Sequence, residues 1–316
     1  MFADDLLLLV KDRDLQRLQR TLDNEMKIKW GEKIGEKWSR YLGKEWRCRG
    51  GRFEVRVPEA YFEALLKEAG LEDARPTVSP CDMSAKKDVD SPKLGAVEHG
   101  TFRRWVGKLM YATQARPDIA YATGMLERCF HCPSPALCDD AYRVLRYLQH
   151  NIDSGLTYSR SSAPLAGMSD SDWSTGRSTT GWAFLYANAS ILWGTVAQPS
   201  IALSTCEAEL MALSSAGDAA VLLGKRLQAV GRRSPSPIPL SVDNKAARDL
   251  AYNPEHHDKS KHIMAHHFRI RLNVESHRII VPFVSTDDNY SDFFTKALRT
   301  PVFMKFRRTI MNISTP

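Results

Sequence analysis

The order of strand-like and helical segments between residues 165 and 298 constrains the fold of this chain most strongly. Three short apolar segments come first and are separated by turn-forming residues: 165–169, 181–186 and 191–193. Helical and strand-like periodicity then alternates, with predicted helices at 204–227, 244–252, 262–276 and 287–298 and predicted strands at 237–242 and 279–284. Three successive strands followed by this alternation predict an α/β fold, in which helices cover a mixed sheet.

Four acidic side chains lie at the junctions of these predicted elements. Asp170 lies where the first strand ends, and Glu209 lies in the first turns of the helix 204–227. Asp243 lies between a strand and a helix, and Asp292 lies within the last helix. Hydrolysis of a phosphodiester requires an activated water and a stabilised leaving oxygen, and two divalent cations about 3.5–4 Å apart provide both. Because Mg²⁺ prefers oxygen ligands, these acids predict a metal-dependent nuclease site.

The same acids have local structural explanations, which the sequence leaves open. Ser204 and Glu207 have the spacing of a capping box, which gives Glu207 a bond to the backbone N–H of residue 204. Glu209 points to a different side of the helix, since successive residues turn by about 100°, and is therefore the candidate ligand. Asp243 is alternatively the N-cap of the helix that follows it.

Neighbouring acids raise two further alternatives. Asp170 and Asp172 share one face of a strand, so either can reach a metal ion. Asp287 and Asp288 are explained by their position at the N-terminus of a predicted helix, where negative charge is favourable. The series of acidic segments in one order, rather than any single acid, supports the nuclease prediction.

The charge of the chain favours a polyanionic partner. The 316 residues carry a formal net charge of +7, with a pI near 9.1, which raises the expectation of a nucleic-acid ligand. The longest clean apolar run, 6–10, is far too short to span a bilayer, and the first residues lack the basic start of a secretory signal. We therefore expect an intracellular protein, cytoplasmic or nuclear, with no membrane partner.

Cysteine and histidine offer alternative metal sites. The six cysteines do not predict a disulfide framework in a chain of this length. Cys129, His131, Cys132 and Cys138 have elements of a zinc site but no second ligand pair at finger spacing, and burial beside helical sequence is the favoured explanation. A second group lacks acidic or thiol support and consists of His256, His257, His262, His266 and His267.

The first 160 residues divide at a polar stretch. Residues 12–26 and 59–69 have helical spacing, and residues 53–57 alternate as a half-buried strand. Residues 72–100 are rich in Pro, Ser, Asp and Lys without sustained periodicity, which predicts a linker. Helices are expected at 101–132 and 136–150, and their basic residues either line a phosphate-facing side or are solvated: Arg103, Arg104, Lys108, Arg143 and Arg146.

Motifs along nearly the whole chain resemble the C-terminal part of a copia-type LTR retrotransposon Pol polyprotein. Phe2-Ala3-Asp4-Asp5 is similar to the reverse-transcriptase box with paired aspartates, and residues 106–120 are similar to the connecting region. The motifs that resemble the ribonuclease H domain are Ser169-Asp170-Ser171-Asp172-Trp173, Arg177-Ser178-Thr179-Thr180-Gly181, the segment 198–204, Glu207-Ala208-Glu209, Asp243-Asn244, Lys261-His262-Ile263 and Asp292-Phe293-Phe294-Thr295-Lys296.

This resemblance implies a domain organisation and a function. It implies a truncated reverse-transcriptase palm and thumb remnant at 1–75, a linker at 76–100, a helical connection at 101–160 and a ribonuclease H-like mixed sheet covered by helices at 165–299. The implied activity is hydrolysis of the RNA strand of RNA–DNA hybrids with two Mg²⁺ or Mn²⁺ ions, without a small-molecule substrate. The implied metal ligands are Asp170, Glu209, Asp243 and Asp292.

The resemblance also implies what the amino-terminal part does not do. Asp4 and Asp5 match the paired polymerase aspartates, but the third carboxylate and the fingers have no counterpart, so we expect a vestigial polymerase site without polymerisation.

We expect basic side chains and one histidine to contact the hybrid, mainly at its phosphates. These candidates are Arg177, Lys259, Lys261 and His262. Two departures from the family pattern, a short 173–177 segment and a shifted His-Phe pattern at 264–268, favour keeping a competing hypothesis. Under that hypothesis the chain is a catalytically silent nucleic-acid-binding remnant.

Overall fold

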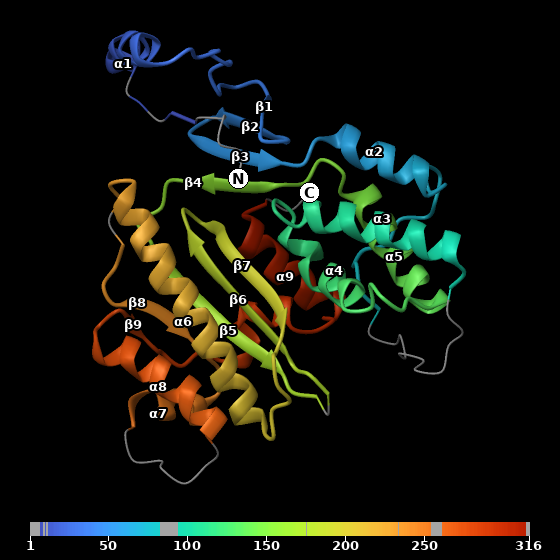
Figure 1. The fold of residues 1–316 in the computed structure, drawn as a ribbon, viewed down its shortest axis with the longest axis vertical. Coiled ribbons are helices and arrows are strands. Elements are labelled where there is room, and N and C mark those ends of the chain that lie inside the picture. Colours follow the sequence, from blue (N-terminus) through green and yellow to red (C-terminus); the bar gives the residue numbers. More distant parts are fainter. Residues whose placement is uncertain are drawn as a thin grey trace.

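A five-stranded mixed sheet lies at the centre of the described part of the carboxy-terminal half (Figure 1). The computed structural model describes residues 7–8, 10, 12–82, 94–174, 176–232, 234–253 and 261–313, with only the backbone of 12, 261–265 and 267. The strand order is β7-β6-β5-β8-β9, with bounds β5 (Ala166–Asp172), β6 (Thr179–Tyr186), β7 (Ala189–Ala197), β8 (Ile238–Ser241) and β9 (Ile279–Ile280). β5, β6 and β7 are antiparallel, whereas β8 pairs in parallel with β5 and β9. This arrangement confirms the predicted mixed sheet.

The two faces of this sheet are covered by different parts of the chain. Successive residues of β6 point to opposite faces, so buried Phe184 joins the core beneath α6 while Ala183 joins the core of the other face. The first face is covered by α6 (Thr205–Ala229), α7 (Lys245–Tyr252) and α8 (Lys261–Glu275), and α6 runs across the strands in Figure 1. The other face packs against η3 (Tyr290–Phe294), α9 (Thr300–Met311) and helices from the middle of the chain.

A second, antiparallel sheet of four strands forms in the described residues of the amino-terminal half. Its order is β1 (Ser39–Tyr41), β2 (Lys44–Arg49), β3 (Arg52–Arg56) and β4 (Leu156–Ser159). β3 pairs along its length with β4, which lies about 100 residues later in the chain. Segments on both sides of the predicted 76–100 linker therefore share one sheet, and the division into separate domains stays a proposal.

The helices of the amino-terminal half and the connection pack on each other beside these sheets. Their bounds are α1 (Asp12–Glu25), α2 (Glu59–Glu68), α3 (Ala96–Ala112), α4 (Ala120–Glu127) and α5 (Pro135–His150). Side chains from all but α1 share one core with α9 and η3. Within the described ranges, no helix combines the length and apolar character needed to span a bilayer.

The single helix predicted at 101–132 is wrong. α3 ends at Ala112, a short 3-10 helix η1 (Pro117–Ile119) follows, and α4 begins after it. Pro117 has no backbone N–H to continue a helix, and it disfavours the helical conformation of the residue before it. Arg116 accordingly adopts a φ of −126° and a ψ of 73°.

The closing helix predicted at 287–298 is also wrong. The structure has two 3-10 helices there, η2 (Thr286–Asp288) and η3, and the last helix is α9, which the sequence did not predict. Asn289 separates the two short helices: its side-chain oxygen accepts from the N–H of Ser291, 3.2 Å away, and its Nδ2 donates to the carbonyl of Ser169, 3.3 Å away. A tertiary bond to β5 therefore interrupts the segment that periodicity alone makes helical.

A buried ionic network holds α9 against η1 and α5. Oδ2 of Asp118 accepts from Nη2 of Arg116 at 2.8 Å, from the hydroxyl of Tyr147 at 2.6 Å and from Nε of Arg307 at 3.2 Å. Burial alone would raise the pKa of Asp118, but the charge and hydrogen bonds of Arg116, with help from Arg307 and Tyr147, hold that pKa well below its usual range. The carboxylate thus stays ionised and fully partnered inside the core.

Candidate metal centre

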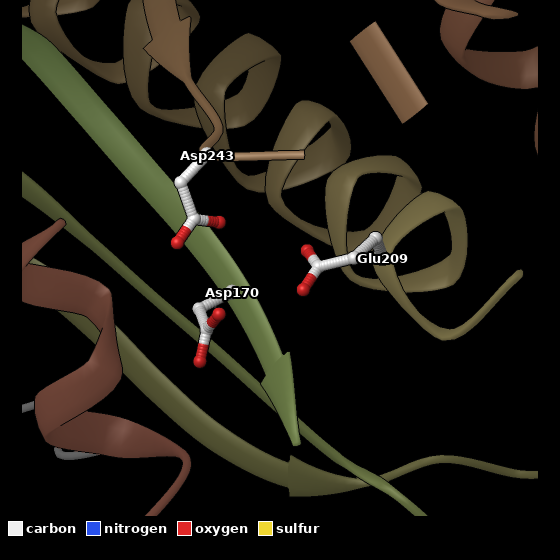
Figure 2. Close-up of side chains that lie close together, drawn as sticks. All are labelled: Asp170, Glu209 and Asp243. Carbon is white, nitrogen blue, oxygen red and sulfur yellow. The ribbon is translucent and has the colours of Figure 1, made fainter. Parts of the chain in front are cut away.

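Three of the four predicted acids meet in space. One carboxylate oxygen from each of Asp170, Glu209 and Asp243 lies within 4.8 Å of the others, and Figure 2 shows the three side chains turned toward a common point. Asp170 and Glu209 are only 3% and 7% exposed, and Asp243 is half-buried. Among the described residues this is the one group of three or more acidic, His or Cys side chains that approach so closely.

Asp170 lies inside β5, not after it, because the strand is longer than predicted. Its partner in the antiparallel pairing is Gly181 on β6. A Cβ on Gly181 would lie 2.5 Å from Cγ2 of Thr295, so glycine is what allows η3 and the residues after it to approach the sheet. Thr295 in turn donates a hydrogen bond from its hydroxyl to Oδ2 of Asp170. The 3-10 segment thereby fixes the orientation of the central carboxylate.

Glu209 is positioned by the start of α6. Ser204 is the N-cap, as predicted, and accepts from the N–H of Glu207 at 3.2 Å. Oε2 of Glu207, however, accepts from the N–H of Leu203 at 2.8 Å, not from residue 204, because the carboxylate reaches one residue further back. Glu209 faces β5, where Oε1 accepts from the N–H of Ser171 at 3.3 Å. Its other oxygen, Oε2, is buried without a hydrogen-bond partner.

Asp243 lies two residues after the end of β8, and the alternative that it caps α7 is wrong. Asn244 is the N-cap, because its side-chain oxygen accepts from the N–H of Ala247 at 3.0 Å. Val242 is held by a parallel bridge to Phe283, which extends the line of the sheet by one residue. The Asp243 carboxylate is therefore directed to the acidic group and takes no part in the cap.

Asp292 lies beside this group but outside it. It is buried on η3, and the ammonium Nζ of Lys296 lies 2.9 Å from its Oδ1 and 3.9 Å from Oδ2 of Asp170. Asp172, the alternative to Asp170, instead accepts a hydrogen bond from the backbone N–H of Thr179 at the start of β6. The fold thus selects Asp170 over Asp172 for the acidic group, while Asp292 adjoins it through Asp170 and Lys296.

The packing of these acids disfavours their charged forms. Burial, followed by the charges of Asp170 and Asp243, raises the pKa of Glu209 well above its usual range. Burial and Asp170 raise the pKa of Asp292 to about 7, even though Lys296 acts in the opposite direction. For Lys296, burial lowers the pKa, but the charges of Asp170 and Asp292 outweigh it and raise that pKa. Each shift has the sign expected for a site that needs added positive charge.

The donor set fits a hard divalent cation. All of the converging groups are carboxylates, which are the ligands that Mg²⁺ and Mn²⁺ prefer, and none is a thiolate or imidazole. The buried Oε2 of Glu209 lacks a hydrogen bond, which is costly unless a cation or a proton satisfies it. Asp170, Glu209 and Asp243 are thus the residues that can hold a metal ion.

The predicted hybrid contacts are only partly within the described structure. Arg177 is exposed between β5 and β6, close in sequence to the acidic group. Lys259 lies outside the described residues, and so do the side chains of Lys261 and His262. The proposed polymerase pair, Asp4 and Asp5, also lies outside them.

Sequence reasoning missed two basic side chains near the acids. Exposed Arg128, at the end of α4, donates from Nη2 to the hydroxyl of Thr179 at 3.1 Å, which brings a cation of the connection to the edge of β6. Lys296 belongs to the motif that begins at Asp292. Its position four residues after that acid is the sequence signal that indicates an ion pair between them. No local pattern marks Arg128, because Thr179 lies 51 residues away.

Comparison with known proteins finds relatives along nearly the whole chain. No family model matches the chain. A Pol polyprotein from transposon TNT 1-94 of Nicotiana tabacum is 28% identical over 309 residues, which cover 94% of this chain. One from transposon RE1 of Arabidopsis thaliana is 29% identical over 323 residues, which cover 98% of it. The chain is thus similar, along nearly its whole length, to copia-type retrotransposon Pol polyproteins. It spans only 23% and 21% of the length of these two relatives.

Solved structures that are similar to this chain include ribonuclease H domains. The N-terminal RNase H domain of rv2228c from Mycobacterium tuberculosis, a fusion with maltose binding protein, has 14% sequence identity to this chain and a TM-score of 0.34. The overlap covers 46% of this chain and 98% of that one.

Proposed function

We propose that this retrotransposon Pol chain is a ribonuclease H that hydrolyses the RNA strand of RNA–DNA hybrids with two Mg²⁺ or Mn²⁺ ions. The observation that carries the proposal is the convergence of Asp170, Glu209 and Asp243 within 4.8 Å, from three elements far apart in the sequence. A buried all-carboxylate group is unfavourable without cations, which argues against a purely structural role.

The proposed roles follow from the positions of the side chains. Asp170, Glu209 and Asp243 would hold one ion, and Asp292 would contribute with Asp170 to the second. Bound divalent ions supply an activated water and stabilise the leaving oxygen. Thr295 orients Asp170, and the backbone N–H of Ser171 orients Glu209, so neither carboxylate has to reorganise when substrate binds.

The hybrid is the proposed partner because the surface near the site is basic. Arg177 and Arg128 are exposed near the edge where β5 ends and β6 begins, and both can contact phosphates. A hybrid is recognised mainly through its shape, its phosphates and its 2′-hydroxyls, which requires cations more than base-specific groups. The proposal includes an intracellular site of action, cytoplasmic or nuclear. It includes no small-molecule substrate.

The test is cleavage of a labelled hybrid. The chain is incubated with an RNA–DNA duplex labelled on the RNA strand and, separately, on the DNA strand, with Mg²⁺ or with EDTA. We expect fragments of the RNA strand only, and only with Mg²⁺. Single-stranded RNA and double-stranded DNA are the specificity controls. Binding of the hybrid without cleavage under any divalent ion would instead support the silent nucleic-acid-binding remnant.

A further inference from the structure

We infer that the ammonium of Lys296 and the second divalent ion compete for the same two carboxylates, so that the two metal positions differ in affinity. The inference rests on the metal centre of the proposed function and concerns how that centre is loaded. It assigns Lys296 a role in metal binding and gives it no direct part in the chemistry.

The geometry places Lys296 on one side of the acidic group. Its Nζ lies 2.9 Å from Oδ1 of Asp292 and 3.9 Å from Oδ2 of Asp170. The two carboxylate side chains are only 8% and 4% exposed, whereas the lysine side chain is 41% exposed. The ammonium therefore reaches in from solvent to two buried acids, and its flexible stem allows it to leave again.

The other side of the acidic group has no such cation. Among the ion pairs of the described residues, those to Lys296 involve Asp170 and Asp292, and none involves Glu209 or Asp243. The buried Oε2 of Glu209 also lacks a hydrogen-bond donor. A divalent ion held by Asp170, Glu209 and Asp243 thus meets the unpartnered Oε2 of Glu209 and two carboxylates without an ion pair in the described structure, and this position should fill first.

The second position is different because two cations cannot share it. An ion held by Asp170 and Asp292 would meet the ammonium that already lies against both carboxylates, and like charges repel strongly in a partly buried site. Lys296 must therefore turn toward solvent before the second ion binds. Its ion pair with Asp292 opposes that step, which lowers the affinity of the second position and leaves the first largely unchanged.

The test measures metal binding without substrate. Isothermal titration calorimetry and Mn²⁺ electron paramagnetic resonance are applied to the full chain, to Lys296→Met, which keeps the stem without the charge, and to Lys296→Arg, which keeps a charge. We expect the parent to bind one Mn²⁺ tightly and a second more weakly. Lys296→Met should tighten the second step by about tenfold or more and leave the first within about threefold, and Lys296→Arg should retain two unequal steps.

A measurement on the parent protein guards against a misfolded variant. The ¹³Cε resonance of Lys296, assigned from its absence in Lys296→Arg, should shift during the second step of a Mg²⁺ titration and not during the first. The inference is overturned if that resonance never responds while two ions bind, if Lys296→Met folds and its second step is no tighter, or if the parent binds no divalent ion.

Cleavage assays separate this inference from the proposed function. A chain that binds Mn²⁺ in two steps, of which only the second depends on Lys296, but does not cleave the hybrid would refute the proposed function and support the inference. A chain that cleaves the hybrid, but whose second step is equally tight in Lys296→Met, would support the function and overturn the inference.

Discussion

Gly181 lies directly opposite Asp170 in the β5–β6 pairing, and the space where its side chain would be is filled by Thr295. This contact lets Thr295 donate its hydroxyl to the Asp170 carboxylate. The position of the central acid thus depends on a glycine on the neighbouring strand and a threonine 125 residues away.

Replacing Gly181 by Ala should damage both stability and the site. The new Cβ would lie 2.5 Å from Cγ2 of Thr295 and 3.0 Å from the backbone carbon of Phe294, so the segment after η3 must move. We expect a loss of about 1–3 kcal/mol in the free energy of unfolding, measured in urea, together with reduced cleavage. Gly107→Ala is the matched control, because Gly107 is exposed on α3, a Cβ there meets nothing within 4 Å, and the change should be neutral or stabilising. Equal stability of the two variants would contradict the packing argument.

Asp243→Asn should abolish Mg²⁺-dependent cleavage of the RNA strand while hybrid binding persists. The change removes the charge and retains the shape, and the cap of α7 is made by Asn244, so helix stability should hardly change. Glu209→Gln should behave in the same way.

Glu207→Gln is the control for both variants, since Gln still accepts from the N–H of Leu203. It should keep most of the cleavage activity, measured with the labelled hybrid. A cleaving Asp243→Asn protein would show that the acidic group is not the active site.

Mg²⁺ should stabilise the chain more strongly as the pH rises. Burial and Asp170 raise the pKa of Asp292 to about 7, and burial with Asp170 and Asp243 raises that of Glu209. Because the folded-state values lie above the unfolded ones, the folded chain binds the extra protons, and its stability in EDTA should fall as pH rises from about 4 to about 7.

Divalent ions replace those protons, so the increase in melting temperature on adding Mg²⁺ should be small near pH 5 and larger near pH 7.5. Thermal melts with Mg²⁺ and with EDTA at both pH values provide the measurement. The increase should disappear in Glu209→Gln. An increase of equal size at both pH values would argue against a shared site for protons and metal.

Arg128→Gln should weaken hybrid binding through the loss of one phosphate contact. Its guanidinium lies at the edge of β6 through its bond to Thr179, near the proposed path of the hybrid. We expect the slope of log K against log salt to fall in magnitude by about 1, measured by fluorescence anisotropy at several salt concentrations.

Arg226→Gln is the control for that measurement. Arg226 is exposed in the last turn of α6, roughly 25 Å along the helix from Glu209. It should leave the slope unchanged. Equal slopes for the parent and Arg128→Gln would remove Arg128 from the interface.

The sequence alone determined the elements whose signals are local. The strand and helix periodicities of 165–284 predicted the mixed sheet, and Ser204 predicted the start of α6. The helical turn separated Glu209 from Glu207, and the order of motifs indicated the retrotransposon family. These features depend on residues within a few positions of one another, which a sequence pattern can record.

Only the tertiary structure decided the features that depend on distant contacts. The bond from Asn289 to Ser169 interrupts a predicted helix, and the bond from Arg307 to Asp118 holds a helix that no pattern predicted. Asn244 caps α7, which leaves the Asp243 carboxylate directed to the acidic group. The approach of Lys296 to Asp170 depends on Gly181, on the neighbouring strand. Periodicity carries no information on such contacts, because they arise from packing between segments separated by up to 189 residues.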